Sequence, residues 1–297
     1  MSTQKYGPHL EHLHAVAGAR SGRFIAVAGK RETDTPVDSQ VHVYAKAKLD
    51  IVVSLPVGGS IDALEFAAGD LLIAAGDRGT LWGFDASSDT PTRVFEHALG
   101  SPDASSPIAA LASDEDGKTL ACVDEAGNLS TFTVAAGGVT LIARRKLSAR
   151  PLRAVAFDAS SGKLAAAGDD SVVRVFADAK LGGEPREMPI GEGGITALDF
   201  TGDGRVLAGL ADGSIRVAYL EGAADEENRT NDDAHAGAIV GLKLGLQLHD
   251  EAGRELTRRM LSVGRDGVIK AWIHDTRRKP KTIELGSNLK IHAATWL

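Results

Sequence analysis

A short phrase that recurs six times along this 297-residue chain limits what it can fold into. In each copy a tight polar turn residue is followed five positions later by an aromatic or large apolar residue. The pairs are Ser39/Tyr44, Gly79/Phe84, Gly127/Phe132, Ser171/Phe176, Gly213/Ala218 (with Tyr219 beside it) and Gly267/Trp272. Their second members stand 40, 48, 44, 42 and 54 residues apart. A period in the forties with small turn residues is typical of one four-stranded blade of a β-propeller.

Each repeat opens with a second phrase, in which a large residue, any residue, a small residue and a large residue follow one another. The phrase starts at Leu13, Ile61, Ile108, Leu152, Ile195, Ile239 and Ile291. Spacing by two predicts a strand. Because the third residue is always Ala or Gly, we expect this strand to be the innermost of its blade, near the axis, with these small residues at Ala15, Ala63, Ala110, Ala154, Ala197 and Gly241.

The repeats predict an all-β fold: a single β-propeller domain over residues 1–297. Its six complete four-stranded blades are expected at about residues 10–57, 58–104, 105–148, 149–192, 193–236 and 237–286. The seventh opener predicts one extra strand at 288–297.

The repeat ending at residues 260–272, M-L-S-V-G-R-D-G-V-I-K-A-W, resembles that of the WD-repeat β-propeller family. His235 stands near the place of that family's His–Gly pair. The resemblance implies a buried hydrogen-bond network in the sixth blade, formed by His235, Ser262, Asp266 and Trp272. The position of Ser262 is occupied in blades two to five by Ala74, Cys122, Ala166 and Ala208. We therefore expect apolar packing to hold those blades together.

The family resemblance implies a non-catalytic scaffold for protein–protein interaction, a subunit of a multiprotein assembly. The extra opener leaves three architectures open. The chain could be a six-bladed ring with a tail strand, or the front part of a longer chain. It could also be an open seven-bladed propeller whose last blade is completed by a partner's strands, as in some transport-coat relatives of the family. In the last case Ile291 and Trp296 would meet the partner, because exposed strand edges recruit other strands.

A second candidate surface is basic and belongs to the sixth blade. Its residues lie in the insertion 246–259 and in the segment after the third strand, at Arg254, Arg258, Arg259, Arg277, Arg278, Lys279 and Lys281. These two connections emerge at the same end of an antiparallel blade. The cluster is expected either to dock a partner or to form solvated loops that acidic residues of the fifth blade partly neutralise.

The composition argues against several other classes of protein. The net charge of −7 offers no general attraction to nucleic acid or anionic membrane, and no run of 18 apolar residues or signal-peptide core is present. We therefore expect protein partners and a cytoplasmic location. Cys122 is the only cysteine and is expected to be an inert core residue.

No metal, cofactor or catalytic motif is predicted. His9, His12 and His14 form the one histidine cluster, but no third ligand stands in register with them. The alternative function is a propeller enzyme, a hydrolase or lyase with dispersed active-site residues. We expect Asp62, Asp199 and Lys243 on the strand face opposite the small residues, which argues against an acidic cluster at the axis.

Overall fold

The computed structural model describes residues 12–30, 40–45, 50–57, 59–87, 91–100, 105–202, 204–220, 230–244, 248–249, 255–256, 259–273 and 281–284. These residues form strands, turns and one short 3-10 helix, η1 (Ala68–Asp70). The chain divides into two compact units, here called the first unit (within residues 1–149) and the second unit (within residues 150–294). A single domain over residues 1–297 stays a prediction. No described helix has the length and apolar character needed to span a bilayer.

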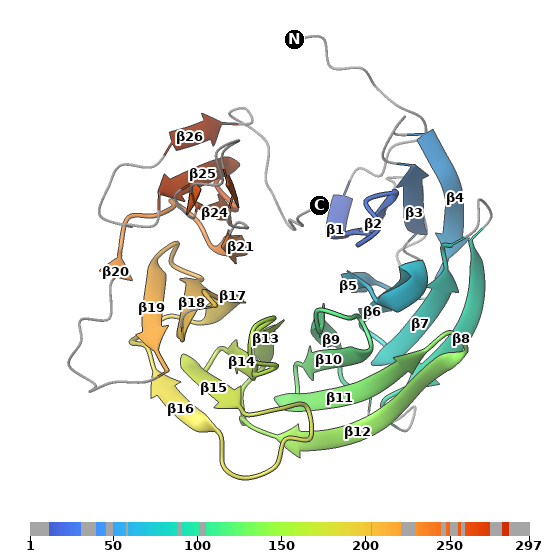
Figure 1. The fold of residues 1–297 in the computed structure, drawn as a ribbon, viewed down its shortest axis with the longest axis horizontal. Coiled ribbons are helices and arrows are strands. Elements are labelled where there is room, and N and C mark those ends of the chain that lie inside the picture. Colours follow the sequence, from blue (N-terminus) through green and yellow to red (C-terminus); the bar gives the residue numbers. More distant parts are fainter. Residues whose placement is uncertain are drawn as a thin grey trace. The chain divides into compact units, whose positions relative to one another are not determined.

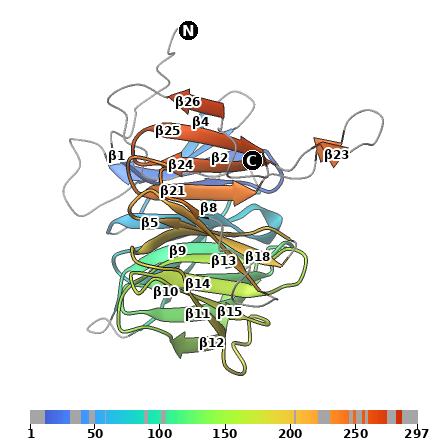
Figure 2. The same cartoon turned by 90° about the vertical axis from the view of Figure 1, so that its left-hand side faces the viewer.

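The first unit contains three four-stranded sheets, or blades, whose strands follow one another in chain order (Figures 1 and 2). Blade one consists of β1 (His12–Gly18), β2 (Phe24–Lys30), β3 (Gln40–Ala45) and β4 (Asp50–Pro56); blade two of β5 (Ile61–Phe66), β6 (Leu71–Gly76), β7 (Thr80–Asp85) and β8 (Thr92–Ala98); and blade three of β9 (Ile108–Ser113), β10 (Thr119–Asp124), β11 (Asn128–Ala135) and β12 (Gly138–Lys146). All neighbouring strands are antiparallel.

The second unit contains three more blades of the same kind. Blade four consists of β13 (Leu152–Phe157), β14 (Leu164–Gly168), β15 (Val172–Phe176) and β16 (Arg186–Pro189); blade five of β17 (Ile195–Phe200), β18 (Arg205–Leu210), β19 (Ile215–Tyr219) and β20 (Thr230–Asn231); and blade six of β21 (Ile239–Leu244), β24 (Arg259–Gly264), β25 (Val268–Ile273) and β26 (Lys281–Glu284). The insertion in blade six carries a two-stranded pair, β22 (Leu248–His249) and β23 (Glu255–Leu256). The six sheets match the six predicted blades.

The core lies between the sheets of each unit. First strands of neighbouring blades pack together, with β5 against β1 and β9, and β17 against β13 and β21. The small third residues of the openers are buried, except Ala110, which is half-buried. The large residues that follow the turns, Phe84, Phe132, Phe176 and Trp272, are buried too, as is the predicted core residue Cys122. The two recurring phrases therefore mark the packing residues of the blades.

Every first strand carries a β-bulge at the second residue of its opener. In blade two Ile61 pairs with Gly76 and Ala63 with Ala75, so Asp62 has no residue opposite it. The same shift isolates His14, Ala109, Arg153, Thr196 and Val240 in the other blades. A bulge inserts one residue, bends the strand and re-aims the extra side chain.

Opposite the bulge the two backbones approach so closely that most blades have glycine there. A Cβ atom on Gly76 would lie 1.8 Å from the carbonyl oxygen of Ser60, and one on Gly168 would lie 2.2 Å from that of Pro151. The equivalent residue is also glycine in blades one and six, Gly29 and Gly264, but it is Asp124 in blade three and Leu210 in blade five.

The recurring turn residue adopts the left-handed conformation, which explains the choice of glycine. Its φ is +60° at Gly79, +86° at Gly127, +89° at Gly213 and +80° at Gly267. Ser171 takes the same conformation at +60°, and its Oγ donates a hydrogen bond to the carbonyl of Gly193 at 2.8 Å.

Two glycines with similar φ allow the stability cost of backbone strain to be distinguished from the cost of steric overlap. Gly202 has a φ of +72° and no atom within 4 Å of the place that a Cβ would take, whereas a Cβ on Gly213 would lie 2.1 Å from the carbonyl oxygen of His235. We expect Gly202→Ala to lower the free energy of unfolding by about 1–2 kcal/mol. Gly213→Ala should cost roughly 1–3 kcal/mol more, because the added methyl forces neighbouring backbone apart. Urea denaturation of both variants measures the difference, and equal losses would contradict the described packing of this turn.

Candidate functional site

The bulged residues lie at the blade ends that also carry the turns between second and third strands. In the first unit the bulged residues of two neighbouring blades, His14 and Asp62, lie close to each other. The Nδ1 atom of His14 is 3.3 Å from Ser60 Oγ and 3.8 Å from Asp62 Oδ1, and Ser60 Oγ is 3.4 Å from the same Asp62 oxygen. This arrangement brings a hydroxyl, an imidazole and a carboxylate together. In a catalytic triad the hydroxyl and the carboxylate contact different ring nitrogens, whereas here both lie near Nδ1, so the three groups do not form a triad.

Two further carboxylates give this end of the first unit a negative character. Asp77 and Glu125 follow β6 and β10 directly, at equivalent positions in their blades. Burial raises the pKa of the Asp62 carboxyl, and repulsion from Asp77 and Glu125 raises it further, while His14 and Ser60 act in the opposite direction. Among the described residues no group of three His, Cys, Asp or Glu side chains is placed to hold a metal ion. The chemistry that fits here is attraction of a positively charged side chain.

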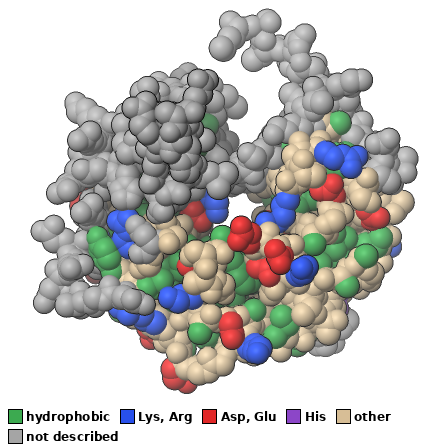
Figure 3. Space-filling view, viewed as in Figure 1, with side chains coloured by type: hydrophobic (Ala, Val, Ile, Leu, Met, Phe, Trp, Pro, Cys, Tyr) green, Lys and Arg blue, Asp and Glu red, His purple; other side chains and the backbone are tan. Residues whose placement is uncertain are grey.

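The same positions in the second unit carry different groups. The bulged Arg153 faces Asp169 of the neighbouring turn, with its Nε and Nη2 atoms each 3.4 Å from a carboxylate oxygen. The bulged Thr196 donates its hydroxyl to the carbonyl of Ile239 at 2.6 Å, and the bulged residue of blade six is Val240. On the face drawn in Figure 3, acidic and basic side chains lie beside one another.

The predicted position of Asp199 and Lys243 was wrong. Between Ala197 and Phe200 the register of β17 with β18 is continuous, so Asp199 lies on the same strand face as Ala197, two residues away. The same holds for Lys243 and Gly241 on β21. Asp199 is buried and accepts a hydrogen bond from Lys243 Nζ at 2.8 Å. These residues form an ion pair between blades five and six.

The structure brings the four network residues named from the sequence together in blade six. Trp272 Nε1 donates to Ser262 Oγ at 2.8 Å, and His235 Nε2 lies 2.7 Å from the same oxygen. His235 Nδ1 lies 3.1 Å from both carboxylate oxygens of Asp266. With a neutral imidazole protonated on Nδ1, every donor has one acceptor: Trp272 to Ser262, Ser262 to His235, and His235 to Asp266.

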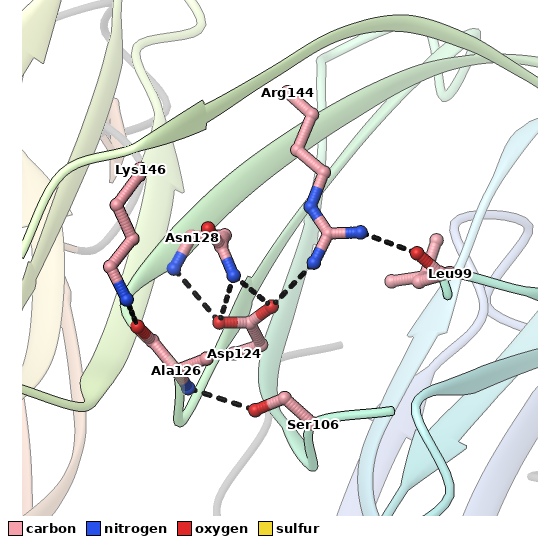
Figure 4. A network of polar contacts seen from close by, with 7 residues as sticks. All are labelled: Leu99, Ser106, Asp124, Ala126, Asn128, Arg144 and Lys146. Atoms are coloured by element: carbon pink, nitrogen blue, oxygen red, sulfur yellow. Dashed lines mark hydrogen bonds and ion pairs between the residues drawn. The ribbon is translucent and has the colours of Figure 1, made fainter. Parts of the chain in front are cut away.

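Blade three has a different polar network at the equivalent place (Figure 4). Asp124 stands at the position of Gly264, which in blade six must be glycine because a Cβ there would lie 2.5 Å from His235 Nδ1. The buried Asp124 carboxylate accepts hydrogen bonds from the backbone and side chain of Asn128 at 2.8 Å and pairs with Arg144 at 3.2 Å. An acid thus fills the space that the histidine ring uses in blade six.

The remaining predicted contact residues cannot be placed. Arg254, Arg258, Arg277, Arg278, Lys279, Ile291 and Trp296, together with His9, lie outside the described residues. For Arg259, Lys281 and His12 only the backbone is described, in β24, β26 and β1. The basic cluster and the extra strand therefore stay predictions.

Comparison with known proteins supports the family resemblance. Residues 186–217 match the family model for the WD domain, G-beta repeat. They run from the fourth strand of blade four through the first three strands of blade five, whereas the sequence resemblance is clearest at 260–272. A comparison with curated protein sequences finds no match.

A solved structure has the same fold. It is Sqt1 of Chaetomium thermophilum bound to the N-terminus of the ribosomal protein L10, with a TM-score of 0.69 and 17% identity over 94% of this chain and 89% of that one. This chain has the fold of a WD-repeat β-propeller. The predicted fold class and the resemblance to WD-repeat proteins are thus confirmed.

The network in blade six predicts unequal costs for two equivalent aspartates. Asp266 accepts hydrogen bonds from His235 and from the backbone of Ala236 and Val268, whereas Asp212 accepts only from Ser214 among the hydrogen bonds of the described residues. We expect Asp266→Ala to lower the free energy of unfolding by about 1–3 kcal/mol, because it leaves buried donors unpaired. The exposed Asp212, changed to Ala, should cost less. Equal losses in chemical denaturation would contradict this role of Asp266.

The same network predicts a loss of stability in acid. Burial lowers the pKa of the His235 imidazole from its ordinary value of 6.5, although Asp266 acts in the opposite direction. The neutral ring therefore stabilises the fold fully above about pH 6.5, and this contribution is lost as the pH falls toward the folded-state pKa. Burial acts to raise the pKa of Asp266, but the hydrogen bonds from Ala236 and Val268 together with His235 lower it below its ordinary 3.8, so its contribution is present above pH 3.8 and is lost as the pH falls below that value.

Thermal melting between about pH 7.5 and pH 5 tests the histidine part of this prediction. The melting temperature of the unmodified protein should fall over this range more than that of His235→Gln, which has no ring to protonate. Parallel curves for the two proteins would show that His235 is not the titrating group.

Proposed function

We propose that this protein is a non-catalytic scaffold that binds other proteins through the bulged ends of its blades. The observation that carries the proposal is the contrast between neighbouring positions of one repeat. The first, third and fourth residues of the opener keep their size in all six described blades, as packing requires. The second residue is His, Asp, Ala, Arg, Thr or Val, although it stands in the same bulge each time.

This variation argues for recognition because packing does not set the chemistry of the bulged residue. A position that only maintained the blade would converge on one residue type, as the small third position does. The bulged residues are half-buried instead, apart from Asp62, which is the most exposed, with 44% of its side chain accessible. Six different side chains on equivalent, rigid supports can specify a partner without altering the fold.

The charges suggest what the first unit would bind. Asp62, Asp77 and Glu125 favour a basic segment of a partner protein, because clustered charge of one sign steers and orients an oppositely charged group. The related Sqt1 was solved with the N-terminus of a ribosomal protein bound to it. We infer a similar kind of ligand here, a segment of a partner chain.

The finer proposal is that the protein is a cytoplasmic subunit of a larger assembly and that a partner adds strands beside residues 290–297. It rests on the seventh opener at Ile291 and on the sequence resemblance. Deletion of residues 287–297 should then abolish the association and leave the melting temperature of the blades nearly unchanged. A truncated chain that binds its partners with equal affinity would contradict the completion of a blade by a partner, but it would not contradict binding through the bulged ends. The alternative of a propeller enzyme finds no supporting observation among the described residues.

Charge reversal at one blade end tests the main proposal. We expect the double variant Asp62→Lys with Asp77→Lys to bind its protein partners with an affinity that is lower by roughly tenfold or more. The two lysines would repel the basic segment that the two carboxylates attract. The matched control is Glu115→Lys with Asp116→Lys, two exposed acids in the turn between β9 and β10, at the opposite end of the blades. Affinity purification with quantitative mass spectrometry compares the two. Equal recovery of the same partners by both variants would rule out the bulged ends as the binding surface.

A further inference from the structure

The fourth strands of blades two and three expose apolar side chains next to each other. Among the described residues, the large hydrophobic side chains that are exposed are Val94 on β8, at 37%, and Leu141 and Ile142 on β12, at 51% and 37%. We call these three residues the rim strip. β8 and β12 lie side by side (Figure 1). Single exposed apolar residues are ordinary, but their concentration on two adjacent edge strands indicates a binding surface.

Two of the three residues are exposed because they stand in β-bulges. On β8, Phe95 pairs with Gly83 and Arg93 with Phe84, so Val94 has no residue opposite it. On β12 the same kind of shift isolates Ile142. The bulge on β8 lays the ring of Phe95 over Gly83, where a Cβ would lie 1.9 Å from that ring. The aromatic residue is thereby packed on the core while the aliphatic one turns to solvent.

The second unit has no comparable strip in its described part. Its fourth strands β16, β20 and β26 have four, two and four residues and pair without a register shift, whereas β8 and β12 have seven and nine. The repeat itself therefore does not require long, bulged fourth strands. Blades two and three have them, and so does blade one, whose β4 has seven residues and a register shift at Val52.

The rim strip is held rigidly by contacts between the two blades. The His97 ring on β8 packs edge-on against Phe132 on β11, with centroids 5.7 Å apart. Arg144 on β12 donates to the carbonyl of Leu99, just after β8, and to the buried Asp124 (Figure 4). A partner would meet an ordered surface, which lowers the entropy cost of binding.

The charges beside the rim strip select its occupant. β12 contains Arg144, Arg145 and Lys146 and no acidic residue. Asp124 neutralises Arg144, while Lys146 Nζ bonds to the uncharged carbonyl of Ala126. On β8 the two charged residues, Arg93 and Glu96, pair with each other at 3.3 Å. The three cations of β12 outnumber Asp124 and the adjacent Glu125, so the strip is flanked by net positive charge in a chain whose net charge is −7.

We propose that the rim strip binds an extended protein segment in which apolar residues alternate with Asp or Glu. Its apolar side chains would cover Val94, Leu141 and Ile142, and its carboxylates would face the basic end of β12. A second copy of this chain fits less well, because a symmetric contact between two β12 strands would place no acidic side chain of β12 against their cations. This surface lies on the fourth strands and is distinct from the bulged ends of the first strands.

A peptide titration tests the proposal on the full chain. The probe is a fluorescent Glu-Leu-Glu-Val-Glu-Leu-Glu peptide followed by anisotropy, and Lys-Leu-Lys-Val-Lys-Leu-Lys is the control peptide. We expect the acidic peptide alone to bind, and more weakly as salt rises from about 0.05 to 0.5 M. The double variant Leu141→Ser with Ile142→Thr should weaken binding roughly tenfold or more, and Leu261→Thr, an apolar-to-polar change on β24 of the second unit, should leave it unchanged. Lys146→Glu is a second test that leaves the apolar residues in place, and it too should weaken binding.

Four results would overturn the proposal. The acidic peptide could fail to bind at concentrations up to about 1 mM. Both peptides could bind equally, or the strip variants could bind as well as the unmodified chain. Finally, sedimentation could show that the chain self-associates and that the double variant does not, in which case the rim strip is covered by a second copy.

Discussion

In each blade the innermost strand contains one residue more than its partner accommodates, and the two backbones close together opposite the bulge. In blades two and four the approach is near enough that a side chain opposite the bulge would collide with backbone atoms, as the 1.8 Å separation at Gly76 shows, whereas blades three and five accommodate Asp124 and Leu210 there. The bulge bends the strand so that its small third residue packs against the neighbouring blade, and it turns the second residue outward. One backbone feature thus positions both the core and the surface that we assign to partner binding.

The polar networks of blades six and three place different side chains in the space beside the bulge. Blade six has glycine opposite its bulge and fills the space with the His235 ring, which connects Asp266 to Ser262 and Trp272. Blade three has Asp124 there, satisfied by Asn128 and Arg144. Buried polar groups of this kind stabilise a fold only when every member has a partner. The Arg144 contact also fixes the two outer strands that carry the rim strip, so core polarity and surface order are linked in these blades.

The sequence predicted the repeats, the six blades, the tight turns and the burial of Cys122, because period-two hydrophobicity and turn residues report local structure directly. It did not predict the bulges at Asp62 and its equivalents, since a bulge depends on the register between two strands. The strand face of Asp199 was assigned wrongly for another reason, because Asp199 stands two residues after Ala197 and period-two alternation alone places both on one face. Two signals were available: the second opener position varies in chemistry, and a glycine recurs opposite it in four of six blades. The fourth strand of blade five, Thr230–Asn231, has no apolar residue that could reveal it.

Residue-specific photo-crosslinking in cells tests most directly whether the bulged ends are the functional surface. A photoreactive amino acid placed at Asp62 in one variant and at Asp116 in another probes the two ends of the same unit with the same chemistry. We predict one discrete set of protein adducts from position 62 that position 116 does not give. Adducts of equal identity and yield at both positions, or adducts from position 116 alone, would contradict binding through the bulged ends.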